Sequence, residues 1–192
     1  MSEITIVKKP TPDFDHGRGG LEPFAVVIHV MQGFLEGTDA EFSVKASEDS
    51  SHYGVPRAEG PVHQYVDEAD TAWHAGLPQI CYTNPALHPT WPLFIEGSRP
   101  NLYTIGIENE GFSVPCAGHQ ATGPWTDFQY EANAQLVAAA AKRWNFPVDD
   151  LHVVRHGDIY VPKKLLCPGQ FCDMARIVAR ARQISANGAQ VA

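Results

Sequence analysis

The sequence lacks any apolar run of the roughly 18 residues that are needed to span a bilayer, so no membrane-spanning segment is expected. Its first 20 residues also lack a continuous apolar stretch followed by a small-residue cleavage site, which argues against a secretory signal. Basic side chains are in the minority: 14 Lys and Arg stand against 22 Asp and Glu, and the formal charge is -8. Because phosphate contacts require a basic surface, neither nucleic acid nor an anionic membrane is expected as a partner.

Cysteine is also scarce, and the four cysteines show no CxxC spacing, which argues against a four-cysteine zinc knuckle. In a reducing compartment all of them should remain thiols. A disulfide between Cys81 and Cys116 is the alternative if the protein matures outside the cell. The chain does contain 16 Gly and 15 Pro, which predict many loops and turns. Its content of 44% hydrophobic residues is typical of a folded protein.

The length of 192 residues suits one domain with a hydrophobic core. We predict a single domain over residues 1–192, with its core at about 22–186 and a flexible C-terminal tail, SANGAQVA. Residues 76–101 are rich in Pro, Gly and aromatic side chains and show no periodicity. Since loops of this length in compact domains are usually functional, we expect this one to line one side of a groove at the functional site.

Five short segments have the β-branched, apolar composition of strands: 25–30, 51–57, 61–67, 104–111 and 152–156. Two other segments show helical periodicity. In residues 126–144, Thr126 and Gln129 match a capping box ahead of apolar residues at four-residue spacing, and residues 172–185 form the second segment. Strands separated by helices of this length predict the α/β class, with a central mixed β-sheet flanked by helices.

The candidate site comes from the ends of predicted strands. His29 and His156 each end a strand, and Cys167 follows the second histidine within the polar segment RHGDIYVPKKLLCPG. Two imidazoles and one thiolate are ligands that Zn²⁺ accepts in tetrahedral geometry. Because three protein ligands leave the fourth position open for water, this set indicates a catalytic zinc ion as the cofactor.

Two further kinds of group could assist such a zinc ion. In the segment TIGIENEG, Glu108 alternates with Ile105 and Ile107, so its carboxylate should point away from the isoleucine face. A carboxylate in that position can take a proton from water. Lys163 or Lys164 could stabilise the oxyanion that forms when water adds to a carbonyl group.

Five segments together resemble a known family, the zinc-dependent N-acetylmuramoyl-L-alanine amidases shared by phage endolysins, bacterial wall amidases and peptidoglycan-recognition proteins. In the family's order they are VVIHV, SSHYGV, VHQYVDEADTAWHAG, TIGIENEG and RHGDIYVPKKLLCPG, within residues 25–170. The resemblance implies a single domain like that of the peptidoglycan-recognition proteins and a partner that is peptidoglycan or a muropeptide. It also implies hydrolysis of the amide bond between N-acetylmuramic acid and L-alanine.

Carried over residue by residue, the resemblance implies three zinc ligands and a catalytic glutamate, which are His29, His156, Cys167 and Glu108. Another branch of the family uses a tyrosine where this chain has Ser51, so the glutamate route is expected here. Relatives usually keep a lysine two residues before the last ligand, where this chain has Leu165. That departure leaves Lys163 and Lys164 as candidates for the catalytic cation, and we expect Lys164.

Two further histidines of the matching segments, His74 and His52, are candidates for substrate binding. His74, in the motif AWHAG, is expected to line the groove, and Trp73 beside it to lie in the core. His52 is grouped with His74 as a substrate-binding candidate. A strand histidine that is hydrogen-bonded to the backbone, or one that supports the site from behind, is the alternative for His52.

Two other functions stay open at the level of sequence. A peptidoglycan-recognition module would hold a muropeptide without cutting it, and the loss of a zinc ligand would favour that function, yet all three ligands are present. A cysteine hydrolase would use Cys167 as its nucleophile and a histidine as the base. For the amidase, we expect a chain that stays in the cytoplasm until it is released to act on the wall as an endolysin, or a cytoplasmic enzyme that recycles wall fragments.

Overall fold

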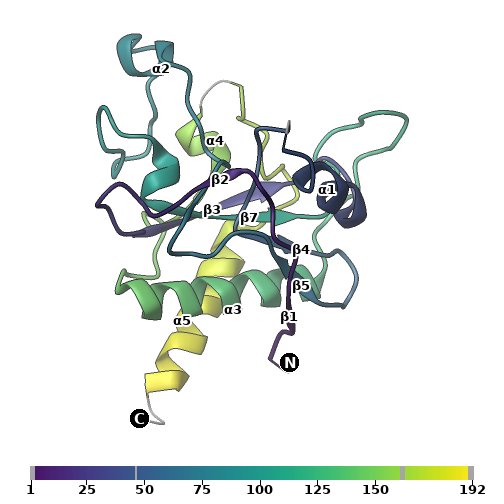
Figure 1. Ribbon diagram of the computed structural model, residues 1–192. Coiled ribbons are helices and arrows are strands. Elements are labelled where there is room, and N and C mark those ends of the chain that lie inside the picture. Colours follow the sequence, from purple (N-terminus) through teal and green to yellow (C-terminus); the bar gives the residue numbers. More distant parts are fainter. Residues whose placement is uncertain (1–2, 46, 161–162, 190–192) are drawn as a thin grey trace.

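The computed structural model describes residues 3–45, 47–160 and 163–189, and its central element is a six-stranded sheet (Figure 1). In spatial order the strands are β1 (Ile6–Lys8), β5 (Val62–Gln64), β4 (Tyr53–Val55), β7 (Thr104–Asn109), β3 (Ala25–Val30) and β8 (Val153–Arg155). The β4–β5 pair is antiparallel and the other neighbours are parallel. A small antiparallel sheet joins β2 (Phe14–Asp15) and β6 (Thr71–Ala72). The predicted α/β class with a central mixed sheet is confirmed.

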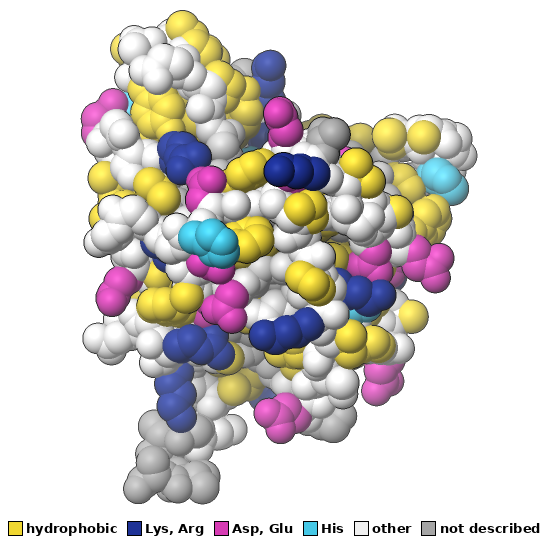
Figure 2. Space-filling view, in the orientation of Figure 1, with side chains coloured by type: hydrophobic (Ala, Val, Ile, Leu, Met, Phe, Trp, Pro, Cys, Tyr) yellow, Lys and Arg dark blue, Asp and Glu magenta, His cyan; other side chains and the backbone are white. Residues whose placement is uncertain are grey.

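Helices lie on both faces of the central sheet. The long helices α3 (Asp127–Trp144) and α5 (Met174–Ala189) pack against each other below it in Figure 1. The short helices are α1 (Leu35–Phe42), α2 (Ile80–Thr83), η1 (Pro100–Leu102) and α4 (His156–Ile159). Across the described ranges, no helix combines the length and the apolarity that a membrane crossing requires. Basic and acidic side chains are interspersed over the face shown in Figure 2.

Side-chain alternation along β3 and β7 separates two layers of the interior. The layer between the sheet and the long helices contains Val26, Ile28, Ile105, Ile107, Leu136 and Ile177. On the opposite face of the sheet, Ala25 and Val27 belong to a second buried cluster. Because successive side chains of a strand point to opposite faces, His29 lies on the same face as Ala25 and Val27, away from α3.

The helix predicted over residues 126–144 is confirmed as α3, together with its capping box. Thr126 Oγ1 accepts a hydrogen bond from the backbone N–H of Gln129 at 3.2 Å, and Gln129 Oε1 accepts one from the backbone N–H of Thr126 at 3.2 Å. Two backbone donors of the first turn are thereby satisfied. The helix ends at Asn145, whose φ of 55° is left-handed, a common way to end a helix.

Several elements differ from the expectations. β1 and α1 were not predicted, since β1 is short and exposed and α1 has only two buried positions, Thr38 and Phe42. The tail that was expected to be flexible from residue 185 is helical as far as Ala189, because Ile184 packs against the core and continues the apolar side of α5. Cys81 is buried, Cys116 is exposed and both are free thiols, so the alternative disulfide is absent.

Candidate active site

Two neighbouring strands bring His29 and Glu108 together. β3 and β7 are parallel, and their register pairs His29 with Glu108. Residues paired in register point to the same face of a sheet, so both side chains lie on the face that is not covered by α3. His156 follows directly after β8, which is the neighbour of β3 on its other side. The carboxyl ends of three adjacent parallel strands therefore meet here, where α/β sheets commonly bind ligands.

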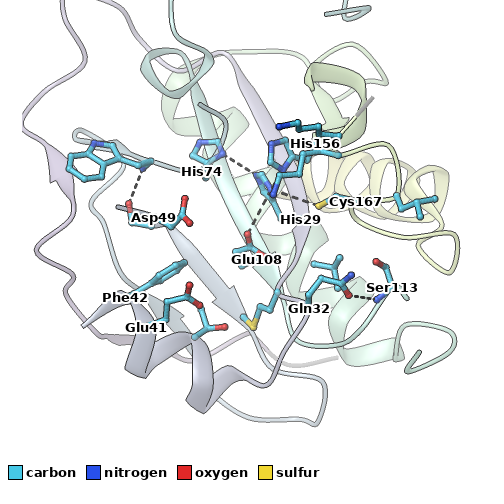
Figure 3. A pocket seen from close by; sticks show the side chains of 18 residues that line it. His29, Gln32, Glu41, Phe42, Asp49, His74, Glu108, Ser113, His156 and Cys167 are labelled. Atoms are coloured by element: carbon cyan, nitrogen blue, oxygen red, sulfur yellow. Dashed lines mark hydrogen bonds and ion pairs between the residues drawn. The ribbon is translucent and has the colours of Figure 1, made fainter. Parts of the chain in front are cut away.

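A pocket of about 350 Å³ opens over these strand ends (Figure 3). Its floor includes His29, Glu108, His156 and Cys167. One wall was not foreseen and comes from α1 and the residues after it: Thr38, Glu41, Phe42 and Asp49. Residues 76–101, which were expected to line the groove, are not among the residues that surround this pocket. That expectation is wrong for the pocket itself, because Trp91 and other apolar residues of this loop pack instead in a buried cluster with Tyr103.

The three predicted zinc ligands converge. His29 Nδ1 lies 2.9 Å from His156 Nδ1 and 4.0 Å from Cys167 Sγ. One ligand atom from each of the three residues lies within 4.8 Å of the other two. Ligands of a tetrahedral zinc ion are roughly 3.3–3.6 Å apart, given metal–ligand bonds of about 2.0–2.3 Å. The spacing, the burial of both histidines and the N,N,S donor set all fit a zinc ion.

The ionisation of these groups is consistent with metal ligands. Burial lowers the pKa of His29 well below its ordinary value and lowers that of His156 to about 3, so both imidazoles are neutral. Burial raises the pKa of the Cys167 thiol to about 12, with a further contribution from Glu108. A bound cation would favour the thiolate instead. His156 Nε2 is buried without a hydrogen-bond partner among the described residues.

Glu108 lies beside this cluster. Its Oε1 atom is 3.8 Å from His29 Nδ1, and its side chain is 17% exposed toward the pocket. Its Oε2 atom is buried and, within the described part of the chain, has no hydrogen-bond partner. Burial raises the pKa of Glu108 to about 8, while the positive charge of Lys164 opposes that shift. A carboxyl group with a pKa near neutrality can both accept and return a proton.

The loop that carries Cys167 is fixed by its own backbone. The N–H of Gly157 donates to the Cys167 carbonyl at 3.0 Å, and the N–H of Cys167 donates to the Lys164 carbonyl at 2.8 Å. The peptide bond between Cys167 and Pro168 is cis. A Cβ atom at Gly157 would lie 2.9 Å from the Lys164 carbonyl oxygen, so glycine permits this close approach.

Lys163 and Lys164 both line the pocket, but their electrostatic influence differs. The charge of Lys164 lowers the pKa values of Glu108, His29 and His156. Lys163 contributes to none of these shifts. The electrostatic influence on Glu108 and His156 therefore favours Lys164 over Lys163, and its catalytic role stays a prediction.

The other sequence candidates divide into two groups. His74 lines the pocket and its Nδ1 is 3.0 Å from His29 Nε2. Trp73 also lines the pocket and is half-buried, so its expected place in the core is wrong. His52 is fully buried and lies outside the pocket lining, where its Nδ1 accepts a hydrogen bond from the backbone N–H of Gly106 at 3.0 Å. The structure thus supports the backbone-bonded alternative for His52 over direct contact with substrate.

Comparisons with a family model and with known proteins all point to the same family. The family model described as N-acetylmuramoyl-L-alanine amidase matches residues 19–170. N-acetylmuramoyl-L-alanine amidase A of Achromobacter lyticus is 25% identical over 154 residues, covering 76% of this chain and 71% of that protein. The 1,6-anhydro-N-acetylmuramyl-L-alanine amidase AmpD of Haemophilus influenzae is 31% identical over 130 residues, covering 68% of this chain but only 57% of that protein.

Solved structures agree with the sequence relatives. The crystal structure of a selenomethionine derivative of AmpD superposes with a TM-score of 0.66 at 25% identity, covering 94% of this chain and 95% of that one. Escherichia coli AmiD, in complex with anhydro-N-acetylmuramic acid-L-Ala-D-gamma-Glu-L-Lys, gives a TM-score of 0.64 at 26% identity, covering 82% of this chain and 57% of that one. With the family model spanning most of the sequence and these structures sharing its fold, the chain belongs to the N-acetylmuramoyl-L-alanine amidase family.

Proposed function

We propose that this protein hydrolyses the amide bond between N-acetylmuramic acid and L-alanine, with a zinc ion held by His29, His156 and Cys167. The observation that carries the proposal is the convergence of these three side chains within 4.8 Å on the floor of a pocket that also contains Glu108. Membership of the amidase family and the muropeptide bound to the E. coli AmiD relative support the choice of substrate. When bound, zinc supplies Lewis acidity, which activates water and polarises a carbonyl group.

Glu108 would move the proton in this reaction. Its side chain is 17% exposed toward the pocket, so the carboxyl group can accept a proton from a water molecule that attacks the amide carbon. When the C–N bond breaks, the same carboxyl group can return that proton to the departing amino group of L-alanine. The raised pKa of Glu108 favours the protonated form that this second step needs.

Lys164 would stabilise negative charge. Addition of water converts the amide oxygen into an oxyanion, and a nearby ammonium group lowers the energy of that state. Lys164 lines the pocket and influences both Glu108 and His156, so its charge acts at the site where the oxyanion would form. Lys163 lines the same pocket without this influence.

A cysteine hydrolase is the second candidate, and the environment of Cys167 disfavours it. Burial raises the pKa of the thiol to about 12, whereas a catalytic cysteine needs a lowered pKa. The thiol is also 4.0 Å from His29 Nδ1, which is already 2.9 Å from His156 Nδ1. A non-catalytic recognition module is disfavoured because both the ligand set and Glu108 are present in the pocket.

The decisive experiment combines metal analysis with identification of the bond that is cut. Purified protein should contain about one zinc ion per chain, and a chelator should abolish its activity. Digestion of peptidoglycan should release stem peptides that begin with L-alanine, which mass spectrometry detects, without new reducing ends. Parallel digestion of intact wall and of a soluble 1,6-anhydro-muropeptide distinguishes a lytic enzyme from a recycling one. New reducing ends would indicate a glycosidase and contradict the proposal.

A further inference from the structure

His29 uses both of its ring nitrogens, and the one that faces away from the ligand cluster begins a chain of hydrogen bonds. His29 Nε2 lies 3.0 Å from His74 Nδ1, and His74 Nε2 lies 3.3 Å from Thr104 Oγ1. Thr104 Oγ1 in turn lies 2.7 Å from the carbonyl oxygen of Pro100. His29, His74 and Thr104 are at least nine-tenths buried, so bulk water does not compete for these bonds. Figure 3 shows the His74 ring directed at His29.

The last acceptor sets the direction of the whole chain. A carbonyl oxygen can only accept, so the single proton of the Thr104 hydroxyl is donated to Pro100. The Thr104 oxygen must then accept from His74, which places a proton on His74 Nε2 and leaves His74 Nδ1 as an acceptor. His29 must therefore donate from Nε2. In a neutral imidazole that leaves the lone pair on Nδ1, the atom that faces His156 and Cys167.

The sequence of β7 creates room for this arrangement. Thr104, Gly106 and Glu108 alternate onto one face of the strand, opposite Ile105 and Ile107. A Cβ atom at Gly106 would lie 2.5 Å from His74 Cγ, so the ring of His74 lies directly on the backbone of Gly106. One face of β7 thus supplies the hydroxyl that orients His74, the space that the ring occupies, and the carboxylate beside the ligands.

We propose that His74 and Thr104 are positioning residues that hold His29 in its Nε2–H tautomer, so that the Nδ1 lone pair is directed at the metal. The inference concerning the metal rests on the proposed function, whereas the tautomer can be observed without any metal. It gives His74 a contact with a proposed metal ligand in addition to its place in the pocket lining. Partners of this kind fix the orientation of histidine ligands and contribute to metal affinity.

The first test needs neither metal nor substrate. ¹⁵N NMR of the histidine rings in zinc-free protein should show His29 protonated at Nε2 and His74 protonated at Nε2. In His74→Leu, which keeps bulk but removes the acceptor, the His29 tautomer should become mixed. In His74→Asn, whose side-chain carbonyl can replace the Nδ1 acceptor, it should remain Nε2–H. A wild-type His29 protonated at Nδ1 would overturn the proposal outright.

The second test measures the zinc dissociation constant by competition with a chromophoric chelator. His74→Leu should weaken zinc binding by about 10- to 100-fold, the range for lost outer partners of metal ligands, and His74→Asn should recover most of the affinity. Thr104→Val should weaken binding by a smaller factor, while Thr104→Ser should restore it. The matched control is Thr71→Val, because Thr71 is equally buried and its hydroxyl also donates to a backbone carbonyl, that of Gly17, away from the pocket.

The outcomes separate the two proposals. If His74→Leu and Thr104→Val bind zinc as tightly as wild type and keep the His29 tautomer, the positioning role is wrong even though the metal site stands. If wild-type protein binds no zinc but shows the His74-dependent Nε2–H tautomer, the positioning role stands and the proposed metal function fails. If Thr71→Val weakens zinc binding as much as Thr104→Val does, the loss reflects general destabilisation and the role of Thr104 is overturned.

Discussion

The Glu108 carboxylate lies 3.8 Å from His29 Nδ1, because the parallel register of β7 and β3 pairs these two residues. The contact places a proton acceptor directly beside the proposed ligand cluster. Burial at this position raises the pKa of Glu108 to about 8. A buried carboxyl oxygen without a hydrogen-bond partner costs stability, and groups with strongly shifted pKa values cluster at functional sites, which agrees with a catalytic role.

Replacing Glu108 by Gln should leave zinc binding intact and reduce turnover by about 100-fold or more, the range for a lost general acid or base. Gln matches the size of Glu but cannot take a proton. Turnover of a soluble muropeptide, measured with zinc content on the same samples, checks this. Glu110→Gln is the matched control: Glu110 accepts a hydrogen bond from the backbone N–H of Arg57, lies outside the pocket lining, and should keep full activity. Wild-type turnover in Glu108→Gln would rule out the proposed proton transfer.

Alanine at any one of the proposed ligands, His29, His156 or Cys167, should abolish stable zinc binding, because a three-ligand site seldom tolerates the loss of a member. Zinc per chain, determined by elemental analysis after dialysis, measures this. Cys167→Asp should retain some zinc and activity, since a carboxylate is also a zinc ligand. Cys81→Ala is the control, because Cys81 is a buried thiol in α2, away from the pocket. Full zinc occupancy in all three ligand variants would contradict the assignment.

The two lysines should separate kinetically. Lys164→Ala should lower kcat by about 100-fold or more by removing charge stabilisation of the oxyanion. Lys163→Ala should have a mild effect, because Lys163 lines the pocket without shifting the pKa values of the site groups. Steady-state kinetics on both variants measure the difference. The reverse order of effects would assign the role to Lys163 and leave the rest of the mechanism unchanged.

The packing of α5 on α3 should depend on pH through Glu131 and Arg180. Arg180 Nε and Nη2 donate to the two oxygens of Glu131 at 2.7 and 3.0 Å, which lowers the pKa of Glu131. Because the pKa of Glu131 is lower in the folded than in the unfolded state, the ion pair stabilises the fold at pH values above the unfolded-state pKa. This stabilisation is lost as the pH falls through the folded-state pKa. Arg180→Gln should therefore lower the free energy of unfolding at pH 7 by up to about 1 kcal/mol.

Urea denaturation at pH 7 and at several acidic pH values measures that effect. The difference between wild type and Arg180→Gln should shrink as the pH falls through the titration of Glu131. The Glu131→Gln variant should show the same narrowing, and a double-mutant cycle isolates the pair. A constant difference at all pH values would mean that Arg180 acts through packing of its aliphatic stem alone.

Local patterns in the sequence were sufficient to predict a helix start, the faces of a strand and the ends of two strands. The capping box at Thr126 and Gln129 and the alternation of Glu108 with Ile105 and Ile107 depend on neighbouring residues alone, and the structure agrees with both. The positions of His29 and His156 at strand ends also follow from short apolar runs. Such signals survive in a single sequence because helix and strand periods are properties of the backbone.

Tertiary structure decided what these residues meet. The strand order β7-β3-β8 places Glu108, His29 and His156 side by side, although they are far apart in the chain, and no local pattern fixes that order. The wall formed by α1 was missed because a helix with two buried positions has little periodic signal. From its motif, His74 was expected in the groove and Trp73 in the core. The contacts of His74 depend on the space above Gly106, and Trp73 lines the pocket that has α1 as one wall. The face of a strand on which a side chain lies follows from the local alternation of residues. Its hydrogen-bond partners depend on which distant strands pair and in which register, and this is fixed only when the sheet assembles.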